Sequence, residues 1–271
     1  MKAGVGWPLE YPNINTSTLA SLGVKTMFDW SMDHKPAIDA PENGIEFLPM
    51  QWGCKLGTGS IDEVKVEAFA KAFPGSRWLI FNEPDNISQA NCGTWHAAVA
   101  FHKIQSIVRA HDLTAKLYIC GTSFYPAHIE YLRQMTWNYK GRYGCLPQVD
   151  GVHFHSYATN FADRFNWRML QEEALATHYW LESQPAFRGK PVIISEYGVL
   201  SGSWYKDDAK RIADEFLPIM FEFWENQSWV ENHLWFSTYY NEHTYQPSNL
   251  FNLDGSLTVV GKSWKRLAAN A

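Results

Sequence analysis

The stretch "RWLIFNEPD" at residues 77–85 begins as an apolar run and ends in a carboxylate followed by proline. The run has the composition of a buried strand, and Pro84 ends it because proline has no N–H to donate to a sheet. Burying the lone carboxylate of Glu83 costs several kcal/mol unless it is paired or hydrogen-bonded. A structural strand gains nothing from such a residue, so Glu83 indicates a functional site at the strand end.

Similar apolar, β-branched or aromatic runs recur along the chain. They are "AGVGW" (3–7), "VKTMFDW" (24–30), "IEFLPMQW" (45–52), "RWLIFNE" (77–83), "KLYICGTS" (116–123), "GVHFHSY" (151–157), "PVIISEY" (191–197) and "HLWFSTYY" (233–240). Their spacing, on average about thirty residues, is the length of one strand–helix unit. Strands that alternate with helices run parallel, and eight such units predict an α/β fold, a (β/α)8 TIM barrel. We expect one catalytic domain over residues 1–271.

Helical patterns lie between most of these runs. Helices are predicted near 16–22, 95–110, 126–139, 166–183, 207–226 and 261–269, and another opens at a capping box over 60–63 and closes at 74–75. The interval between Trp30 and Ile45 is short and contains Pro36 and Pro41. The second helix is therefore expected to be reduced to a turn.

The composition excludes several classes of protein. Of 271 residues, 46% are hydrophobic and 19% charged, which favours a large packed core over disorder. The net charge of −5, with no basic run, argues against binding to nucleic acid or anionic membranes. No apolar stretch approaches the ~20 residues that span a bilayer. A monomer is expected, and also a secreted protein whose leader is not present in this chain.

The four cysteines do not form a metal-binding pattern. No pair has the spacing of a zinc or thioredoxin-type motif. Cys54 and Cys92 both follow predicted strands and are candidates for a disulfide between neighbouring loops, whereas Cys120 is expected to be a buried free thiol. The glycosylation pattern occurs at Asn15, Asn86 and Asn226.

A second carboxylate occupies the position equivalent to Glu83. Glu196, in "ISEYG", ends the seventh predicted strand, and active sites of such barrels lie at the carboxyl ends of the strands. Because side chains alternate along a strand, Leu79, Phe81 and Glu83 are expected to lie on one face of the fourth strand. Val192, Ile194 and Glu196 are expected to lie on one face of the seventh. Two carboxylates facing each other across the barrel mouth are the groups that carry out glycoside hydrolysis, and each pushes the pKa of the other away from its own.

The aromatic content is higher than a core needs, with 13 Trp, 13 Tyr and 16 Phe. Rings at strand ends are suited to stack on sugar faces in a cleft. The tryptophans at or just beyond predicted strand ends are Trp7, Trp30, Trp52, Trp204 and Trp235. They predict an aromatic cleft around the mouth.

The motifs around both glutamates resemble a known group of enzymes. "FNEP" on the fourth strand and "SEYG" on the seventh resemble glycoside hydrolase clan A, the retaining (β/α)8 enzymes. The longer pattern of "GVGW", "FLPMQWG", "FNEPDNISQAN" and "VDGVHFHSYA" is similar to family 128, the endo-β-1,3-glucanases. The resemblance covers nearly the whole chain.

The resemblance implies roles for individual residues. Glu83 would be the general acid/base, Glu196 the nucleophile, and Asn82 a partner of the sugar 2-hydroxyl. His155, Tyr157 and Tyr197 would line the subsite wall. The aromatic floor of the subsite at the reacting sugar would be Trp235, with Tyr239 as the alternative.

The expected activity is endo-cleavage of β-1,3-glucan by double displacement, with a carboxylate separation of about 5 Å and no cofactor. Three alternatives stay open. The chain could hydrolyse another β-linked polysaccharide such as mannan, xylan or β-1,4-glucan, or bind carbohydrate without catalysis. The pair His153 and His155 on one strand face could also ligate a metal, although an inner-barrel histidine with satisfied hydrogen bonds is favoured.

Overall fold

Nine parallel strands form one curled sheet at the centre of the protein. The computed structural model describes residues 1–8, 13–54, 61–161, 164–200, 208–242 and 244–271. The parallel strands are β1 (Ala3–Gly6), β2 (Thr26–Phe28), β3 (Glu46–Phe47), β4 (Met50–Gln51), β5 (Arg77–Ile80), β6 (Lys116–Thr122), β7 (Gly151–Phe161), β9 (Val192–Leu200) and β10 (Val230–Trp235). Their order in the sheet is β3-β2-β1-β10-β9-β7-β6-β5-β4. The short β8 (Arg164–Phe165) pairs antiparallel with the end of β7.

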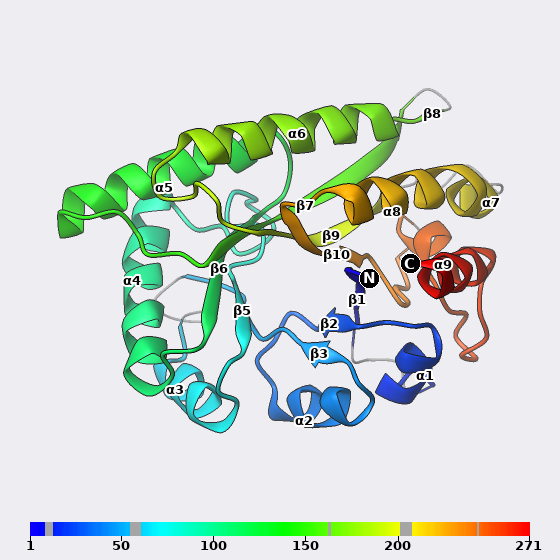
Figure 1. Ribbon diagram of the computed structural model, residues 1–271, viewed down its shortest axis with the longest axis horizontal. Coiled ribbons are helices and arrows are strands. Elements are labelled where there is room, and N and C mark those ends of the chain that lie inside the picture. Colours follow the sequence, from blue (N-terminus) through cyan, green and yellow to red (C-terminus); the bar gives the residue numbers. More distant parts are fainter. Residues whose placement is uncertain (9–12, 55–60, 162–163, 201–207, 243) are drawn as a thin grey trace.

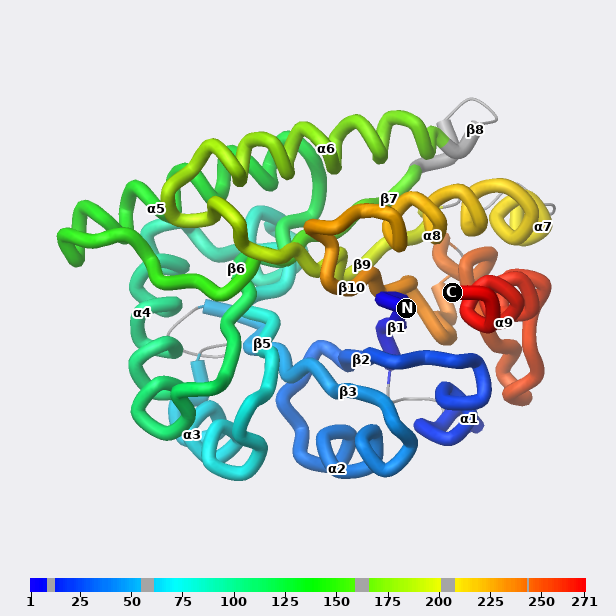
Figure 2. The backbone as a smooth tube through the Cα atoms, viewed as in Figure 1, coloured from blue at the N-terminus to red at the C-terminus, as the bar shows by residue number. Residues whose placement is uncertain are grey.

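Helices surround this sheet, and the chain passes around it in sequence order (Figures 1 and 2). They are α1 (Thr16–Ser21), α2 (His34–Glu42), α3 (Glu63–Ala72), α4 (Thr94–His111), α5 (Ala127–Tyr143), α6 (Trp167–Ser183), α7 (Asp208–Arg211), the π-helical turn η1 (Ile212–Phe216), α8 (Leu217–Asn226), the 3-10 turn η2 (Gln246–Ser248) and α9 (Val259–Asn270). None of the helices in the described ranges is both long and apolar enough to cross a bilayer.

Two helix predictions are corrected. The interval after β2 holds a full helix, α2, rather than a turn. Pro36 lies in its first turn, where a missing N–H has no intrahelical partner to lose, and Pro41 lies near its end. The N-cap of α3 is Asp62, whose side chain accepts a hydrogen bond from the Lys65 amide at 3.0 Å. The predicted cap Ser60 lies outside the described residues.

The third predicted strand is split into two short strands at Leu48 and Pro49. Leu48 N–H donates to Met27 of β2 at 2.8 Å, whereas the Pro49 carbonyl accepts from Leu79 of β5 at 2.9 Å. The segment 46–51 therefore supplies both ends of the sheet order, with β3 paired to β2 and β4 paired to β5.

The core has an inner and an outer part. The inner cluster is built only from strand residues and their extensions: Phe28, Leu48, Met50, Leu79, Tyr118, Ile193 and Leu234. The larger outer cluster joins strand residues such as Val192 and Ile194 to the surrounding helices. Side chains of opposite parity along a strand therefore enter different clusters, as the pleat requires.

Polar side chains fill the interior at the amino ends of the strands. Arg77, which is 9% exposed, pairs with Glu46, and its Nη1 lies 3.3 Å from Oε2 of Glu231 and 2.7 Å from Oδ1 of Asn232. The Tyr118 hydroxyl donates to Glu231. With this end filled, the carboxyl ends of the strands are where a cleft opens.

Candidate active site

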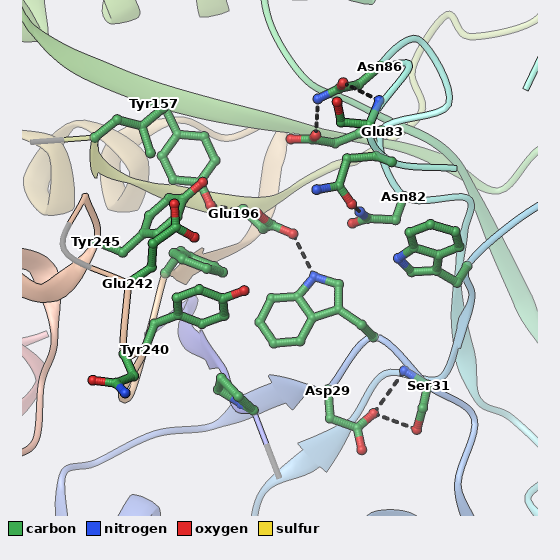
Figure 3. A pocket seen from close by; sticks show the side chains of 18 of the residues that line it. Asp29, Ser31, Asn82, Glu83, Asn86, Tyr157, Glu196, Tyr240, Glu242 and Tyr245 are labelled. Atoms are coloured by element: carbon green, nitrogen blue, oxygen red, sulfur yellow. Dashed lines mark hydrogen bonds between the residues drawn. The ribbon is translucent and has the colours of Figure 1, made fainter. Parts of the chain in front are cut away.

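A cleft of about 1070 Å³ opens at the carboxyl ends of the strands. It is lined by carboxylates, amides and aromatic rings from β7 and β9 themselves and from the segments that follow β1, β2, β4, β5, β6 and β10. Glu83 and Glu196 both line it, from opposite parts of the sheet (Figure 3). The structure therefore places both carboxylates at one mouth of the sheet, as the sequence predicts.

Glu83 reaches the cleft through a break in strand geometry rather than by alternation. Leu79 lies in the inner cluster but Phe81 lies in the outer one, so the prediction that they share a face with Glu83 is wrong. Phe81 has a φ of +72° and Glu83 a φ of +42°, both in the left-handed region. Such conformations cost about 1–3 kcal/mol each and are retained where the surroundings over-determine them. Here the Glu83 amide donates to Gly121 at 2.8 Å.

Glu196 reaches the cleft through a β-bulge. In the pairing of β7 with β9, Phe154 is opposite Ile194 but His155 is opposite Glu196, which leaves Ser195 as an extra residue. The bulge reverses the facing of the following side chain. Ile194 therefore packs in the outer cluster while Glu196 points into the cleft, and the prediction that they share a face is also wrong.

His153 connects these two irregular segments. Its Nδ1 is 2.9 Å from the hydroxyl of Ser195, the bulged residue, and its Nε2 is 3.1 Å from the carbonyl of Ile80, the last residue of β5. The ring is fully buried, and burial lowers its pKa to about 3, so it is neutral at ordinary pH. With both ring nitrogens engaged, His153 is a bracing residue and has no lone pair left for a metal ion.

His155 lies between the two glutamates. Its Nδ1 is 3.0 Å from Oε1 of Glu83 and its Nε2 is 3.4 Å from Oε1 of Glu196. One oxygen of each glutamate and a ring nitrogen of His155 all lie within 4.8 Å of one another. The tertiary structure thus places an imidazole against both carboxylates.

Both carboxylates also accept hydrogen bonds from other side chains. The Trp30 indole donates to Oε1 of Glu196 at 2.7 Å and the Tyr157 hydroxyl to Oε2 at 2.5 Å. The Asn86 amide donates to Oε2 of Glu83 at 2.8 Å (Figure 3). These donors orient both carboxyl groups and partly offset the cost of burying them.

The surroundings push the pKa values of the three groups apart. Burial raises the pKa of Glu196; the His155 charge opposes this rise, and the Glu83 charge adds to it, with a raised pKa as the outcome. Burial also acts upward on Glu83, but the hydrogen bond and charge of His155 and the Asn86 amide outweigh it and lower its pKa. The pKa of His155 is raised because the two glutamates outweigh its burial. Protonation of His155 is therefore favoured, and of the two glutamates Glu196 binds a proton more readily than Glu83.

Glu83, His155 and Glu196 are also close enough together to surround a metal ion. Their oxygens, however, already accept hydrogen bonds from Trp30, Tyr157 and Asn86. The three side chains are therefore arranged to share protons, with the imidazole in reach of both carboxylates.

Some predicted binding residues line the cleft and others lie away from it. Trp30, Trp52, Asn82 and Tyr157 line it, and His155 lies buried behind the glutamates. Four others do not: Trp7, Tyr197 and Trp235 are buried in the outer cluster, and Tyr239 packs against that cluster. The Trp235 indole donates to the Ser248 carbonyl at 2.7 Å. Trp204 lies outside the described residues.

An aromatic wall that sequence reasoning missed follows β10. Phe236, Tyr240 and Tyr245 line the cleft, with ring centroids 5.0–5.5 Å apart. Phe236 also lies 5.6 Å from the ring of Trp30 and 5.8 Å from that of Tyr157. Phe236 adjoins the predicted Trp235, so alternation along the strand was the signal that could have found it.

Two buried acceptors in the cleft have no hydrogen-bond partner among the residues that the structure describes. They are Oδ2 of Asp29 and Oδ1 of Asn82. Asp29 is 8% exposed, and its other oxygen accepts from the amide and hydroxyl of Ser31. Burial, only partly offset by these bonds, raises the pKa of Asp29 to about 6. Unsatisfied acceptors call for a ligand that brings donors, such as hydroxyl groups.

A disulfide joins Cys54, after β4, to Cys92, at the end of the loop that carries Glu83. The Cys92 amide donates to the Pro84 carbonyl at 2.8 Å, and the Tyr131 hydroxyl donates to the Cys92 carbonyl at 2.7 Å. The loop of Glu83 is therefore closed by a bond between Pro84 and Cys92 and is anchored to neighbouring segments at Cys92. Cys120 is a buried free thiol, as expected.

Comparison with known proteins gives one family and one fold. The model of the family described as "Glycosyl hydrolase catalytic core" matches residues 4–264. No curated protein sequence matches the chain.

Solved structures of similar fold include enzymes of glycoside hydrolase family 128, the family that the sequence motifs resemble. An endo-β-1,3-glucanase of subgroup II from Pseudomonas viridiflava has a TM-score of 0.71 at 21% identity, covering 97% of this chain and 96% of its own. A mutant subgroup I endo-β-1,3-glucanase from Amycolatopsis mediterranei, in complex with laminaripentaose, has a TM-score of 0.72 at 23% identity, covering 97% and 98%. A subgroup III curdlan-specific exo-β-1,3-glucanase from Blastomyces gilchristii, in complex with glucose, has a TM-score of 0.66 at 22% identity, covering 97% of each chain.

Proposed function

Because the chain belongs to the glycosyl hydrolase catalytic core family, we propose that it is a retaining endo-acting hydrolase of β-1,3-glucan. Glu196 is the nucleophile and Glu83 the general acid/base. The observation that carries this proposal is the approach of the two carboxylates, which have oxygens within 4.8 Å of each other. Retaining glycosidases hold their carboxyl groups ≈ 5–5.5 Å apart, whereas inverting ones need room for an intervening water.

In the first step, an oxygen of Glu196 attacks the anomeric carbon as the bond to the leaving oxygen breaks. The proton of Glu83 passes to that oxygen. In the second step, Glu83 takes a proton from water, the water oxygen attacks the anomeric carbon, and the bond to Glu196 breaks. Two displacements return the β configuration. Trp30 and Tyr157 hold Glu196 in line for the attack.

Glu83 must carry a proton when the substrate is bound, although in the empty cleft its pKa is lowered. His155 supplies a route, because its Nδ1 is 3.0 Å from Oε1 of Glu83. A sugar that covers the cleft removes water from Glu83, and loss of water disfavours the charged carboxylate. The proton of His155 then moves to Glu83, and the neutral imidazole accepts a hydrogen bond from the acid.

The length of the substrate follows from the aromatic lining of the cleft. The rings that line it are those of Trp30, Trp52, Phe236, Tyr240 and Tyr245. Each stacked ring contributes on the order of 1 kcal/mol, so several rings hold an oligosaccharide but not a monosaccharide. The similar structures are endo- and exo-β-1,3-glucanases, and this supports the β-1,3 linkage.

We extend the proposal to the architecture and the setting of the protein. Residues 1–271 would form one domain in which segment 46–51 closes the sheet into the (β/α)8 barrel, since its two short strands, β3 and β4, are the two ends of the sheet order and follow each other directly along the chain. The protein would act as a monomer. The Cys54–Cys92 disulfide supports a secreted location, because disulfides persist in oxidising compartments.

A substrate panel tests the function. Laminarin, cellulose, mixed-linkage glucan, xylan and mannan are incubated with the protein, and product sizes are resolved over time. We expect laminari-oligosaccharides of mixed size to appear early from laminarin. Glucose alone from the first time point would overturn endo action, and faster cleavage of xylan or mannan would overturn the linkage.

Two controls separate the other classes of function. Binding of a β-glucan without release of reducing sugar would identify a carbohydrate-binding protein that lacks catalysis. Loss of activity after treatment with EDTA, restored by a divalent metal, would identify a metal-dependent hydrolase. We expect cleavage that EDTA leaves unchanged.

A further inference from the structure

Asn86, three residues after Glu83, has no role in the reaction described so far. Its Nδ2 donates to Oε2 of Glu83 at 2.8 Å, and it lines the cleft beside that residue (Figure 3). Its backbone amide donates to the Glu83 carbonyl at 3.0 Å. The loop therefore folds back so that the side chain of Asn86 meets the carboxyl group of Glu83.

The amide of Asn86 is fixed in one orientation. Its Oδ1 accepts a hydrogen bond from the backbone N–H of Ser88 at 3.0 Å. If the amide rotated by 180°, its NH2 group would face the Ser88 N–H and its oxygen would face the Glu83 carboxylate. Both contacts would then be lost, so Asn86 acts as a permanent donor toward Glu83.

The two oxygens of Glu83 consequently have separate partners. Oε2 accepts from Asn86, whereas Oε1 faces Nδ1 of His155. Together the two bonds hold both ends of the carboxyl group and thereby fix its plane. The groups that surround Glu83 are His155 and Tyr157 from β7, Glu196 from β9 and Tyr245 after β10. Asp85, on the same loop as Glu83, does not bond to Glu83; its carboxylate accepts hydrogen bonds from the amide and hydroxyl of Ser123.

We propose that Asn86 is a positioning residue, which holds the carboxyl group of Glu83 in the plane required for proton transfer and stabilises its ionised form. The proposal rests on the proposed function, in which Glu83 acts as acid and then as base. A donor to Oε2 is of use in both steps. In the first step the Asn86 donor occupies Oε2 and leaves Oε1 to carry the proton that is transferred. In the second step the same donor stabilises the Glu83 carboxylate that takes a proton from water.

The experiment compares Asn86→Ala and Asn86→Asp with the matched control Asn138→Ala. Asn138, on α5, loses an amide bond of similar length, to the hydroxyl of Thr94 at 2.9 Å, and neither of these two residues lines the cleft. Activity is measured against pH on laminarin and on an aryl β-glycoside with a good leaving group. We expect Asn86→Ala to lower kcat on laminarin about tenfold, a part of the 10²–10⁴-fold that general acid–base catalysis contributes, with little change in KM.

The pH profile separates positioning from a structural role. Without the Asn86 donor the pKa of Glu83 rises, so the alkaline limb of kcat/KM moves to higher pH. Asn86→Asp should move it further, because it adds a negative charge beside Oε2. Asn138→Ala should leave both limbs in place. The proposal would be overturned if Asn86→Ala lost kcat together with a fall in Tm while both limbs of its pH profile stayed at the wild-type pH.

A titration of Glu83 by 13C NMR needs no activity and decides the proposal independently. We expect its carboxyl signal to titrate at higher pH in Asn86→Ala than in the wild type, and an unchanged titration would overturn the inference. If the wild type cleaves no glycan at all, the proposed function fails, whereas the NMR result still shows whether Asn86 acts on Glu83.

Discussion

Nδ1 of His155 lies 3.0 Å from Oε1 of Glu83, and the opposite nitrogen of the same ring faces Oε1 of Glu196 at 3.4 Å. The imidazole is fully buried, so its charge acts on both carboxylates with little screening by water. The pH dependence of activity therefore belongs to the three groups together rather than to any one of them.

Replacing His155 by asparagine should move the acidic limb of kcat/KM to higher pH. The His155 charge lowers the pKa of Glu196, so without it the nucleophile ionises only at higher pH. The loss of kcat/KM should be larger at pH 5 than at pH 7. His96→Asn, on the exposed face of α4, is the control. An unmoved acidic limb would show that the His155 charge does not act on Glu196.

The two glutamates should fail in different ways. Glu196→Gln should lose nearly all turnover, because no covalent intermediate forms. Glu83→Gln should lose about 10²–10⁴-fold on laminarin but much less on an aryl glycoside whose leaving group needs no proton. Added azide should give a β-glycosyl azide with Glu83→Ala and an α-glycosyl azide with Glu196→Ala. The opposite stereochemistry would reverse the two roles.

The donors to Glu196 can be removed while an aromatic ring is kept at each position. Trp30→Phe and Tyr157→Phe each delete one hydrogen bond to the carboxylate. Bonds to charged groups are worth about 1.5–3 kcal/mol, so each variant should lose about 10–100-fold in kcat/KM. The acidic limb should also rise, since both donors lower the pKa of Glu196. Tyr179→Phe, at an exposed tyrosine of α6, should change neither quantity.

Asp29→Asn should stabilise the protein at neutral pH. Burial raises the pKa of Asp29 from 3.8 to about 6, which corresponds to about 3 kcal/mol that opposes folding once the group is ionised. Because the folded-state pKa lies above the unfolded value, stability falls as pH rises from 3.8 to about 6 and stays lower above it. The gain from Asp29→Asn should thus be complete above pH 6 and absent below 3.8.

Urea denaturation at pH 3.5 and pH 7 measures this difference. An equal effect at both values would contradict the role of ionisation. An ionised carboxylate that destabilises the fold is retained where it serves a site. We therefore also expect Asp29→Asn to raise KM for laminari-oligosaccharides, since Oδ2 of Asp29 is an unpartnered acceptor in the cleft wall.

Removal of the disulfide should affect both stability and turnover. The bond closes a loop with a sequence separation of 38 residues, for which the chain-entropy model gives about 3–4 kcal/mol. The double variant Cys54→Ser/Cys92→Ser should show a lower Tm and also a lower kcat, because Cys92 ends the loop of Glu83. Cys145→Ser, at an exposed free thiol, should change neither. An unchanged kcat would show that the loop holds its shape without the bond.

Much of the fold could be predicted because it depends on local patterns. The apolar run at residues 77–83 and its counterparts became strands, and the periodic segments between them became helices, since burial of one face selects the element. The turn expected before Ile45 was wrong because prolines in the first turn and near the end of α2 do not break a helix. The split of the third strand at Pro49 depends on which neighbours it meets, which no local pattern states.

The sequence by itself indicated that Glu83 and Glu196 lie toward the carboxyl ends of parallel strands and so face one mouth. Only the tertiary structure decided how each of the two side chains is turned into the cleft. A left-handed residue at Phe81 and a bulge at Ser195 turn each carboxylate inward, against the alternation of its strand. Such irregularities are maintained by contacts between distant segments, such as the bonds from His153 to Ile80 and Ser195.

The same reason explains the aromatic residues. Sequence alone identified rings at strand ends, but whether a ring lines the cleft or enters the core depends on the local direction of the strand and on packing by neighbouring helices. Trp235 is fully buried while the adjacent Phe236 lines the cleft. Residue type and strand period are local properties that a sequence carries. The direction in which a side chain points at an irregular strand end is a property of the packed structure.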